Sequence, residues 1–256
     1  MVVRDGVAGP EVFLQRRVGA MEFAAGMTVF PGGGVDSSDG TADIAWAGPA
    51  PAWWAEKFAT SEPRAKALVC AAVRETFEEC GVLLAGPTAD TVVSDTAGYH
   101  DARGRLERRE LSFAAFLAEE KLVLRADLLR PWANWITPTI EPRRYDTYFF
   151  VAVLPRGQRA DGATTEADEA RWRIPAAALD HWRAGADVLL PPTWTQLDAL
   201  RRFATTAEIF AAEPVIDPIM PEFTRIDGRD LLVFPDYHRY YAELPDPSRL
   251  KGSSRP

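Results

Sequence analysis

Residues 74–82 read RETFEECGV and place three glutamates at helical spacing. At about 100° of rotation per residue, Glu75, Glu78 and Glu79 fall within an arc of roughly 100° on one side of a helix. The opposite side carries the apolar side chains of Val69, Val73, Phe77 and Cys80. The segment therefore predicts a helix that buries one stripe in a core and presents three carboxylates on its other face.

Three like charges so close together destabilise a helix, and these lie near its C-terminus, where the helix dipole disfavours anions. A divalent cation reverses this cost, because carboxylate oxygens, water and substrate phosphates are the ligands that Mg²⁺ prefers. Mn²⁺ accepts the same ligands. The spacing thus favours a site for Mg²⁺ or Mn²⁺, and a solvated acidic face is the alternative interpretation.

Local signals around the glutamates predict where the helix begins and ends. Ser61 is expected as the N-cap, Pro63 lies in the first turn, and Gly81 is expected to end the helix. Apolar runs predict strands at 12–14, 27–30, 82–85, 132–137, 146–154, 171–174 and 230–234. Further helices are expected at 111–121, 175–184 and 193–212. Alternating strands and helices indicate a layered α/β or α+β domain.

A tight turn, FPGGG at residues 30–34, precedes the helix. Together with RETFEECGV it resembles the Nudix box, G-x5-E-x7-R-E-U-x-E-E-x-G-U, with two departures. Counted from Gly33, Asp39 stands in place of the first Glu, and Arg74 follows Asp39 by 35 positions instead of eight. The loop between turn and helix thus carries 27 additional residues. Such an insertion is tolerable because loop-closure entropy grows only logarithmically with length.

The resemblance is to one branch of the Nudix hydrolases in particular, that of the peroxisomal coenzyme A diphosphatases and their bacterial relatives. It extends over roughly residues 12–184 and includes WITPTIEPRRYDTYFFVAVLP at 135–155. It implies a fold of the α/β class, the Nudix α/β/α sandwich with a mixed central sheet, a long insert at about 40–61 and a helical C-terminal extension. The Nudix hydrolase domain is accordingly expected at 1–184 and the extension at 185–256.

Nudix enzymes hydrolyse a diphosphate linked to a further moiety X with Mg²⁺ or Mn²⁺, and the resemblance implies that chemistry here. By motif match, the implied metal ligands are Glu75, Glu79, Glu78 and the carbonyl group of Gly32. Arg74 is implied to position Glu75 through a charge-assisted hydrogen bond. The general base is expected from a glutamate outside the box, Glu166 or Glu169, for which an exposed acidic loop is the competing interpretation.

Arginines near strand ends are the candidates for binding the substrate. With a neighbouring aromatic, the substrate-binding set is Arg16, Arg17, Arg143, Arg144 and Tyr145. For the arginine pair in EPRRYD, an ion pair with Asp146 is the competing interpretation. The coenzyme A signature of related hydrolases has an arginine where this chain has Glu22. The substrate is therefore left open between coenzyme A or acyl-CoA and another nucleoside diphosphate derivative, ADP-ribose or a dinucleotide.

The amino-acid composition limits the classes of molecule that this protein could bind and the compartment in which it is expected. The 256 residues carry 29 Lys and Arg against 37 Asp and Glu, a net charge of −8 that argues against a nucleic-acid binder held by phosphate neutralisation. No run of about 18 apolar residues predicts a membrane span. Cys70 and Cys80 lie too far apart on one helix for a disulfide, which suggests a reduced, cytoplasmic chain. We expect a small-molecule diphosphate substrate and leave a homodimer open. A catalytically silent Nudix module that senses a ligand is the rival to an enzyme.

Overall fold

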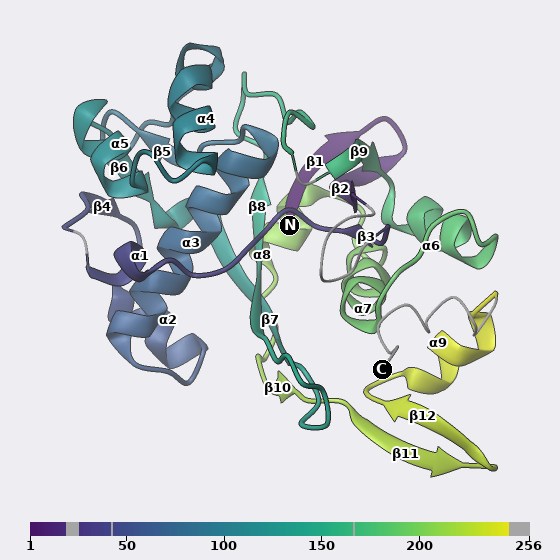
Figure 1. Ribbon diagram of the computed structural model, residues 1–256. Coiled ribbons are helices and arrows are strands. Elements are labelled where there is room, and N and C mark those ends of the chain that lie inside the picture. The colour runs from purple at the N-terminus through teal and green to yellow at the C-terminus, as the bar shows by residue number, and fades with distance from the viewer. Residues whose placement is uncertain (19–25, 42, 166, 246–256) are drawn as a thin grey trace.

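The computed structural model describes residues 1–18, 26–41, 43–165 and 167–245, and a mixed β-sheet runs through their centre (Figure 1). Within these residues the sheet has seven strands, namely β1 (Val2–Gly6), β2 (Gly9–Arg17), β3 (Thr28–Val29), β7 (Leu129–Ile136), β8 (Asp146–Val153), β9 (Ala167–Arg173) and β10 (Pro218–Ile219). The strand order is β10-β7-β8-β1-β2-β3, and β9 pairs with β2. β1 runs parallel to β8 and β10 to β7, whereas the other pairs are antiparallel.

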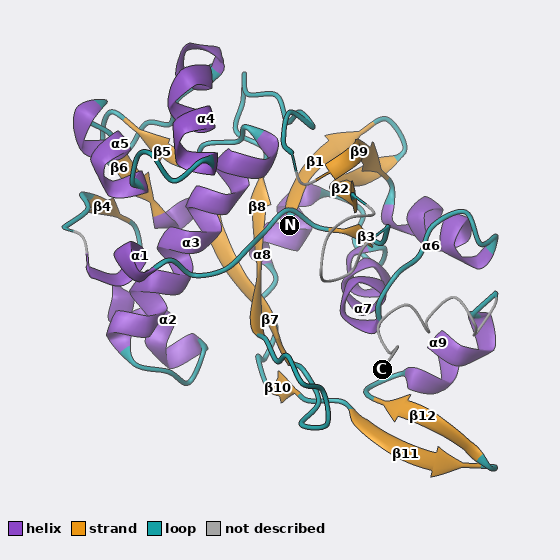
Figure 2. Ribbon diagram, in the orientation of Figure 1, coloured by secondary structure: helices purple, strands orange, loops and turns teal. Residues whose placement is uncertain are grey.

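Helices cover both faces of this sheet (Figure 2). The first layer contains α1 (Ser37–Thr41), α2 (Pro51–Lys57), α3 (Glu62–Cys80), α4 (His100–Glu107) and α5 (Phe113–Glu119). A small sheet joins this layer, in the order β4 (Trp46–Ala47), β6 (Val123–Arg125) and β5 (Ala85–Gly86). The second layer contains α6 (Pro175–Arg183), α7 (Pro191–Leu200), α8 (Thr206–Ala211) and α9 (Tyr237–Glu243).

Strand β2 shows how one sheet serves two cores. Phe13 belongs to the hydrophobic core that contains α3, whereas Val12 and Leu14 belong to the core that contains α6 and α7. Successive side chains of a strand point to opposite faces, so β2 contributes to both layers. The architecture is therefore the α/β/α sandwich with a mixed sheet that the resemblance to the Nudix hydrolases implies.

Helix α3 has the predicted bounds. Ser61 takes the N-cap position in an extended conformation, although its side chain accepts no capping hydrogen bond. At the other end, Gly81 has φ of 70° and its amide donates to the Phe77 carbonyl. A left-handed residue at this position is the common way to end a helix, and glycine adopts that conformation without strain.

Two sequence predictions of elements are wrong, and each has a physical reason. The segment 82–84 is buried but forms no strand, because the Gln158 amide takes the place of a neighbouring strand by bonding both the N–H and the C=O of Leu83. The helix expected at 193–212 is two helices, α7 and α8. The chain breaks between them, and Thr205 begins α8 by accepting a hydrogen bond from the Glu208 amide.

The segment after Ala184 is not only helical. It adds β10 to the main sheet and contains a separate hairpin, β11 (Glu222–Ile226) with β12 (Arg229–Val233), which lies away from the sheet in Figure 1. Trp182 of α6 and Trp194 of α7 belong to the same hydrophobic core, one on each side of the expected boundary. The division into 1–184 and 185–256 stays a prediction. Among the helices of the described ranges, none has the length and apolar character needed to cross a membrane.

Candidate active site

The last two turns of α3 hold the three predicted carboxylates in largely covered positions. The side chains of Glu75 and Glu78 are 14% and 13% exposed, and Glu79 is 5% exposed. On the opposite side of the helix, Phe77 and Cys80 are buried in the core. The helix therefore has the predicted amphipathic placement, but its acidic face is covered by other parts of the chain and is not an open, solvated surface.

Arg74 connects this helix to the loop that precedes it. Its Nε donates to Oδ1 of Asp39 at 3.1 Å, and its Nη2 donates to Oδ2 of the same carboxylate at 2.9 Å. Nη2 also donates to the carbonyl oxygen of Gly34 at 2.7 Å. Asp39 is only 2% exposed. The paired, two-bond geometry is the strong form of an arginine–carboxylate contact, and it fixes α1 and the glycine turn against α3.

The remaining nitrogen of Arg74 faces two of the site carboxylates. Nη1 donates to Oε1 of Glu75 at 2.6 Å and lies 3.4 Å from Oε1 of Glu78. Burial by itself lowers the pKa of Arg74, but the bond to Asp39 and the charges of Glu75 and Glu78 outweigh burial and raise it above the usual value. Arg74 therefore stays charged, as positioning Glu75 requires.

The glycine turn lies directly against the acidic face. A Cβ atom added to Gly33 would collide with the Glu75 carboxylate. The amide of Gly32 donates to Oε2 of Glu79 at 2.9 Å. On the sheet side, Gln15 of β2 donates from Nε2 to the backbone carbonyl of Glu79 at 3.0 Å. Glu79 thus lies between the glycine turn and strand β2, and Glu75 lies against the same turn.

Glu78 lies beside Arg74, one turn further along α3. Burial raises the pKa of its carboxyl group, and the positive charge of Arg74 acts in the opposite direction. The backbone carbonyl of Glu78 accepts a hydrogen bond from Nε of Arg103, a residue of α4. Glu78 therefore faces Arg74 with its side chain and α4 with its backbone.

These groups fit a hard divalent cation. The side chains of Glu75 and Glu79 and the carbonyl of Gly32 supply only oxygen donors, and the glycines leave space beside the carboxylates. As the side chains stand, no group of three or more His, Cys, Asp and Glu within the described ranges could hold a metal ion. In this arrangement Arg74 donates hydrogen bonds to the carboxylates of Glu75 and Glu78, and the Gly32 amide donates one to the carboxylate of Glu79. Metal binding would therefore require these carboxylates to converge while Arg74 keeps its bond to Oε1 of Glu75.

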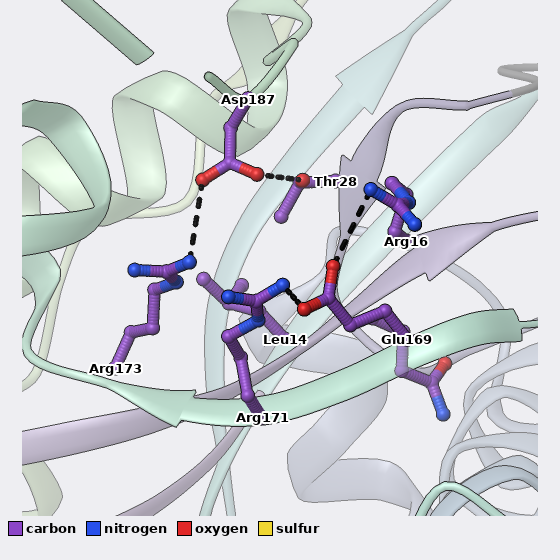
Figure 3. A pocket seen from close by; sticks show the side chains of 8 residues that line it. Leu14, Arg16, Thr28, Glu169, Arg171, Arg173 and Asp187 are labelled. Atoms are coloured by element: carbon purple, nitrogen blue, oxygen red, sulfur yellow. Dashed lines mark hydrogen bonds and ion pairs between the residues drawn. The ribbon is translucent and has the colours of Figure 1, made fainter. Parts of the chain in front are cut away.

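The two candidates for the general base are placed differently. Glu166 lies outside the described residues. Glu169 is the register partner of Arg16 in the β2–β9 pair, and both line a small pocket that also contains Arg171 (Figure 3). Glu169 forms ion pairs there with Arg16, at 3.4 Å, and with Arg171. Its strand neighbours Ala170 and Trp172 pack on the α3 side, so Glu169 points to the opposite face of the sheet.

The predicted substrate-binding residues lie in two places, at the end of β2 and in the connection between β7 and β8. Arg16 lies in the pocket of Figure 3, where Asp187 also bonds Thr28. Arg17 lies at the end of β2 after a register shift, and its backbone pairs with Gly26 and Met27. The role of both arginines in binding substrate stays a prediction, and the position of Arg16 gives it no support.

Arg143, Arg144 and Tyr145 lie in the exposed connection between β7 and β8. Asp146, at the end of that connection, accepts a hydrogen bond from Arg64 in the first turns of α3 at 2.6 Å. Arg64 and Glu75 are 11 residues apart, about 16 Å along a helix. This loop therefore lies at the opposite end of α3 from the carboxylates, and the Asp146 ion pair goes to Arg64.

Sequence reasoning missed several residues that build the site. Asp39 was noted only as a departure from the box, yet it occupies the position of the box glutamate and makes the ion pair with Arg74. Its position after the glycine turn was the available signal. Gln15 and Arg103 carry no comparable signal, because neither lies in a motif and each approaches α3 from a distant part of the chain.

An α/β/α sandwich with a glycine turn set against a helix that carries RExxEExG has the architecture of a Nudix hydrolase. The chain belongs to the family of the NUDT19 Nudix domain, whose model matches residues 47–203. This membership confirms the predicted fold class and the resemblance stated from the sequence.

Known relatives agree with this assignment. The acyl-coenzyme A diphosphatase NUDT19 of Xenopus laevis is 27% identical over 236 residues, which cover 78% of this chain and 62% of that protein. The human protein of the same name is 26% identical over 152 residues, or 55% of this chain and 40% of its own length. The chain thus spans less than two thirds of these relatives. A crystal structure of a Nudix hydrolase from Alicyclobacillus acidocaldarius has a TM-score of 0.65 and 27% identity, covering 84% of this chain and 94% of the other.

Proposed function

We propose that this chain is a metal-dependent Nudix hydrolase that cleaves the diphosphate linkage of a nucleoside-diphosphate-linked substrate of the coenzyme A or acyl-CoA type. The observation that carries the proposal is the contact between α3 and the glycine turn. There Arg74 and Asp39 hold Glu75 in place, and the Gly32 amide meets Glu79. The names of the relatives from Xenopus laevis and human support the choice of substrate.

Each residue has a defined part in this proposal. Glu75, Glu79 and the Gly32 carbonyl hold Mg²⁺ or Mn²⁺, with Glu78 as a further ligand. When bound, the ion neutralises the diphosphate and lowers the pKa of water. Arg74 is a positioning residue, since it orients Glu75 and keeps Glu78 turned toward the site. In the overall reaction, the oxygen of water forms a bond to one phosphorus, the bridging P–O bond breaks, and the proton leaves through the base. We favour Glu166 as that base, with Glu169 as the alternative.

Hydrolysis of a substrate panel tests the proposal. Coenzyme A, an acyl-CoA ester, ADP-ribose, NADH and a diadenosine polyphosphate are incubated with Mg²⁺ or Mn²⁺ titrated from zero. We expect metal-dependent release of phosphorylated products, with the coenzyme A compounds cleaved most efficiently. Preference for ADP-ribose or a dinucleotide would contradict the substrate assignment. Tight binding of one compound without turnover of any would favour a ligand-sensing module.

The metal ligands are tested by a matched pair of variants on α3. Glu79→Gln removes a buried charge, whereas Glu62→Gln removes one from the exposed first turn of the same helix. We expect Glu79→Gln to lose metal-dependent turnover and Glu62→Gln to keep it. Full turnover by Glu79→Gln would exclude Glu79 as a metal ligand.

A further inference from the structure

The hairpin of β11 and β12 projects from the molecule beside α9 (Figure 1). Asp227 and Gly228 form its two-residue turn, both with positive φ, 48° and 77°. This is the turn by which Asp-Gly commonly joins two antiparallel strands. Among the described residues, β11 and β12 form a sheet of their own. Because a two-stranded sheet is marginally stable by itself, contacts along its two edges matter for its stability.

The turn fixes the direction in which each backbone group of the hairpin points. Ile226 and Arg229 flank the turn and pair in register, so they exchange hydrogen bonds, as does every second pair after them. The backbone groups of the pairs in between point outward. On β12 such a group is the amide of Leu232, which donates to the hydroxyl of Tyr241 in α9 at 2.9 Å. Helix α9 therefore covers part of the outer edge of β12.

The outer edge of β11 is open. By the same alternation, the N–H and C=O groups of Phe223 and Arg225 point away from β12. Within the described part of the chain, no strand pairs with this edge. β11 also has neither a proline nor a bulge, two features by which proteins block an open edge. The ring of Phe223 is 49% exposed beside it. Such an edge is a template for pairing with another strand.

β11 is complementary to itself in one antiparallel register. In a two-fold pair of β11 strands, outward-pointing residues must lie opposite outward-pointing residues. A two-fold axis at Thr224 meets this condition and pairs all five residues of β11 with those of a second copy. Each Phe223 then lies opposite Arg225 of the second copy, which allows a cation–π contact, and the two Thr224 residues face each other. Moving the axis by one residue keeps only three of the pairs, and in one direction places the two Arg225 residues opposite each other.

We propose that β11 is the surface through which two copies of this chain associate, as a continuous four-stranded antiparallel sheet with its two-fold axis at Thr224. The edge fits a second copy because one register satisfies the outward backbone groups of both strands and sets no like charges directly opposite. The contact is closed, since each β11 has only one open edge. A pair of short strands buries less area than a standard interface, so the dimer is reversible. This association is independent of the hydrolytic activity, and its tests do not use that activity.

Residues at the two-fold axis meet their own copies, which allows a charge-swap test. Thr224→Lys and Thr224→Glu each place like charges opposite each other in the dimer, whereas within the hairpin position 224 faces Leu231. By sedimentation velocity, we expect a concentration-dependent monomer–dimer equilibrium for wild type. Each variant alone should have its Kd for dimerisation raised about fivefold or more. Val215→Lys, which adds the same charge to a side chain 86% exposed and outside the hairpin, should behave like wild type.

An equimolar mixture of the two charge variants should recover the dimer, because Lys then faces Glu across the axis. Recovery also shows that both variants fold. A wild-type chain that stays monomeric at its highest soluble concentration would overturn the inference. So would a dimer that is equally stable in either variant alone, or a mixture without recovery.

A disulfide tests the register itself. Thr224→Cys brings two thiols to opposite positions of a non-hydrogen-bonded pair, where the Cα atoms are about 4.5 Å apart, within the range of a disulfide. In Glu222→Cys, the control, the two positions are about 14 Å apart along the paired strands. Cys70 and Cys80 are buried. In a glutathione redox buffer we expect disulfide-linked dimers of Thr224→Cys and none of Glu222→Cys. Equal cross-linking of both variants, or of neither, would overturn the inference.

Discussion

Asp39 and Arg74 form a buried, two-bond ion pair although 35 residues separate them in the chain. The insertion between them contains α2, and its Trp54 is fully buried against Phe58 and Phe150. The inserted segment therefore folds away from the site and back to it, and Asp39 and Arg74 at its two ends stay in contact. Asp39 stands in the position of the box glutamate and lies next to the helix. The fold thus brings it to Arg74 although their spacing in the sequence differs from that of the box.

Loss of this ion pair should destabilise the protein markedly. Asp39→Ala leaves the guanidinium of Arg74, which is 11% exposed, without its main partner. Breaking a buried pair by removing one member costs about 3 kcal/mol or more. We expect a decrease of that size in the free energy of unfolding measured by urea denaturation, together with loss of turnover. Asp43→Asn, an exposed residue nearby, is the control and should change neither.

The glycine turn provides a sharper test of the site geometry. Gly33→Ala places a methyl group against the Glu75 carboxylate, whereas Gly34→Ala places it in open space. Neither glycine adopts a left-handed backbone, so the comparison isolates the collision. We expect Gly33→Ala to lower kcat/KM by about 100-fold, since small displacements at a reacting centre have effects of that order, and to raise the metal concentration needed for activity. Gly34→Ala should stay close to wild type, and similar losses in both variants would refute the contact.

Local signals explain which parts of the fold were predictable. The bounds of α3 follow from Ser61, Pro63 and Gly81, which act within one turn of the helix. Local signals could not predict the face of the sheet to which Glu169 points. That face depends on where β9 begins, at Ala167, and on the pairing of Glu169 with Arg16 of β2. A shift by one residue would turn this side chain toward α3.

Contacts between distant segments escaped prediction for a similar reason. Gln158 replaces a strand for Leu83 although 75 residues separate them. Arg103 reaches the carbonyl of Glu78 from a helix whose polar sequence gave no periodic pattern. Such contacts depend on how the layers stack, which a single sequence does not specify locally.

Asp198 should make the stability of the second helical layer depend on pH. This carboxylate is 3% exposed and contacts Arg201, Arg202 and Arg239, the last of which belongs to α9. Burial raises its pKa, but the bonds from Arg239 and Arg202 prevail and lower it from 3.8 to about 2. A carboxyl group with a lowered pKa stabilises the fold above its unfolded pKa, and this contribution is lost as the pH falls toward the folded value.

The measurement compares wild type with Asp198→Asn. We expect wild type to be more stable by about 2 kcal/mol at pH 5–7, from roughly 1.4 kcal/mol for each pH unit of the difference in pKa. The difference in free energy of unfolding between the two proteins, measured by urea denaturation, should decrease progressively below pH 4. Asp180→Asn serves as the control, because Asp180 pairs with Arg183 on the surface, where ion pairs contribute little. A gap that does not change with pH would mean that Asp198 acts through packing alone.

The identity of the general base can be decided by comparing Glu166 with Glu169. Glu169 is bonded to Arg16 and Arg171 on the face of the sheet opposite α3, so Glu169→Gln should leave kcat within about twofold of wild type. General base catalysis contributes about 10²- to 10⁴-fold, and we expect a loss of that size for Glu166→Gln. The acidic limb of the pH–rate profile should also disappear in that variant, which a purely structural loss would not produce. A large loss in Glu169→Gln with an unchanged profile for Glu166→Gln would assign the base to Glu169 and would require β9 to turn that side chain toward α3 when substrate binds.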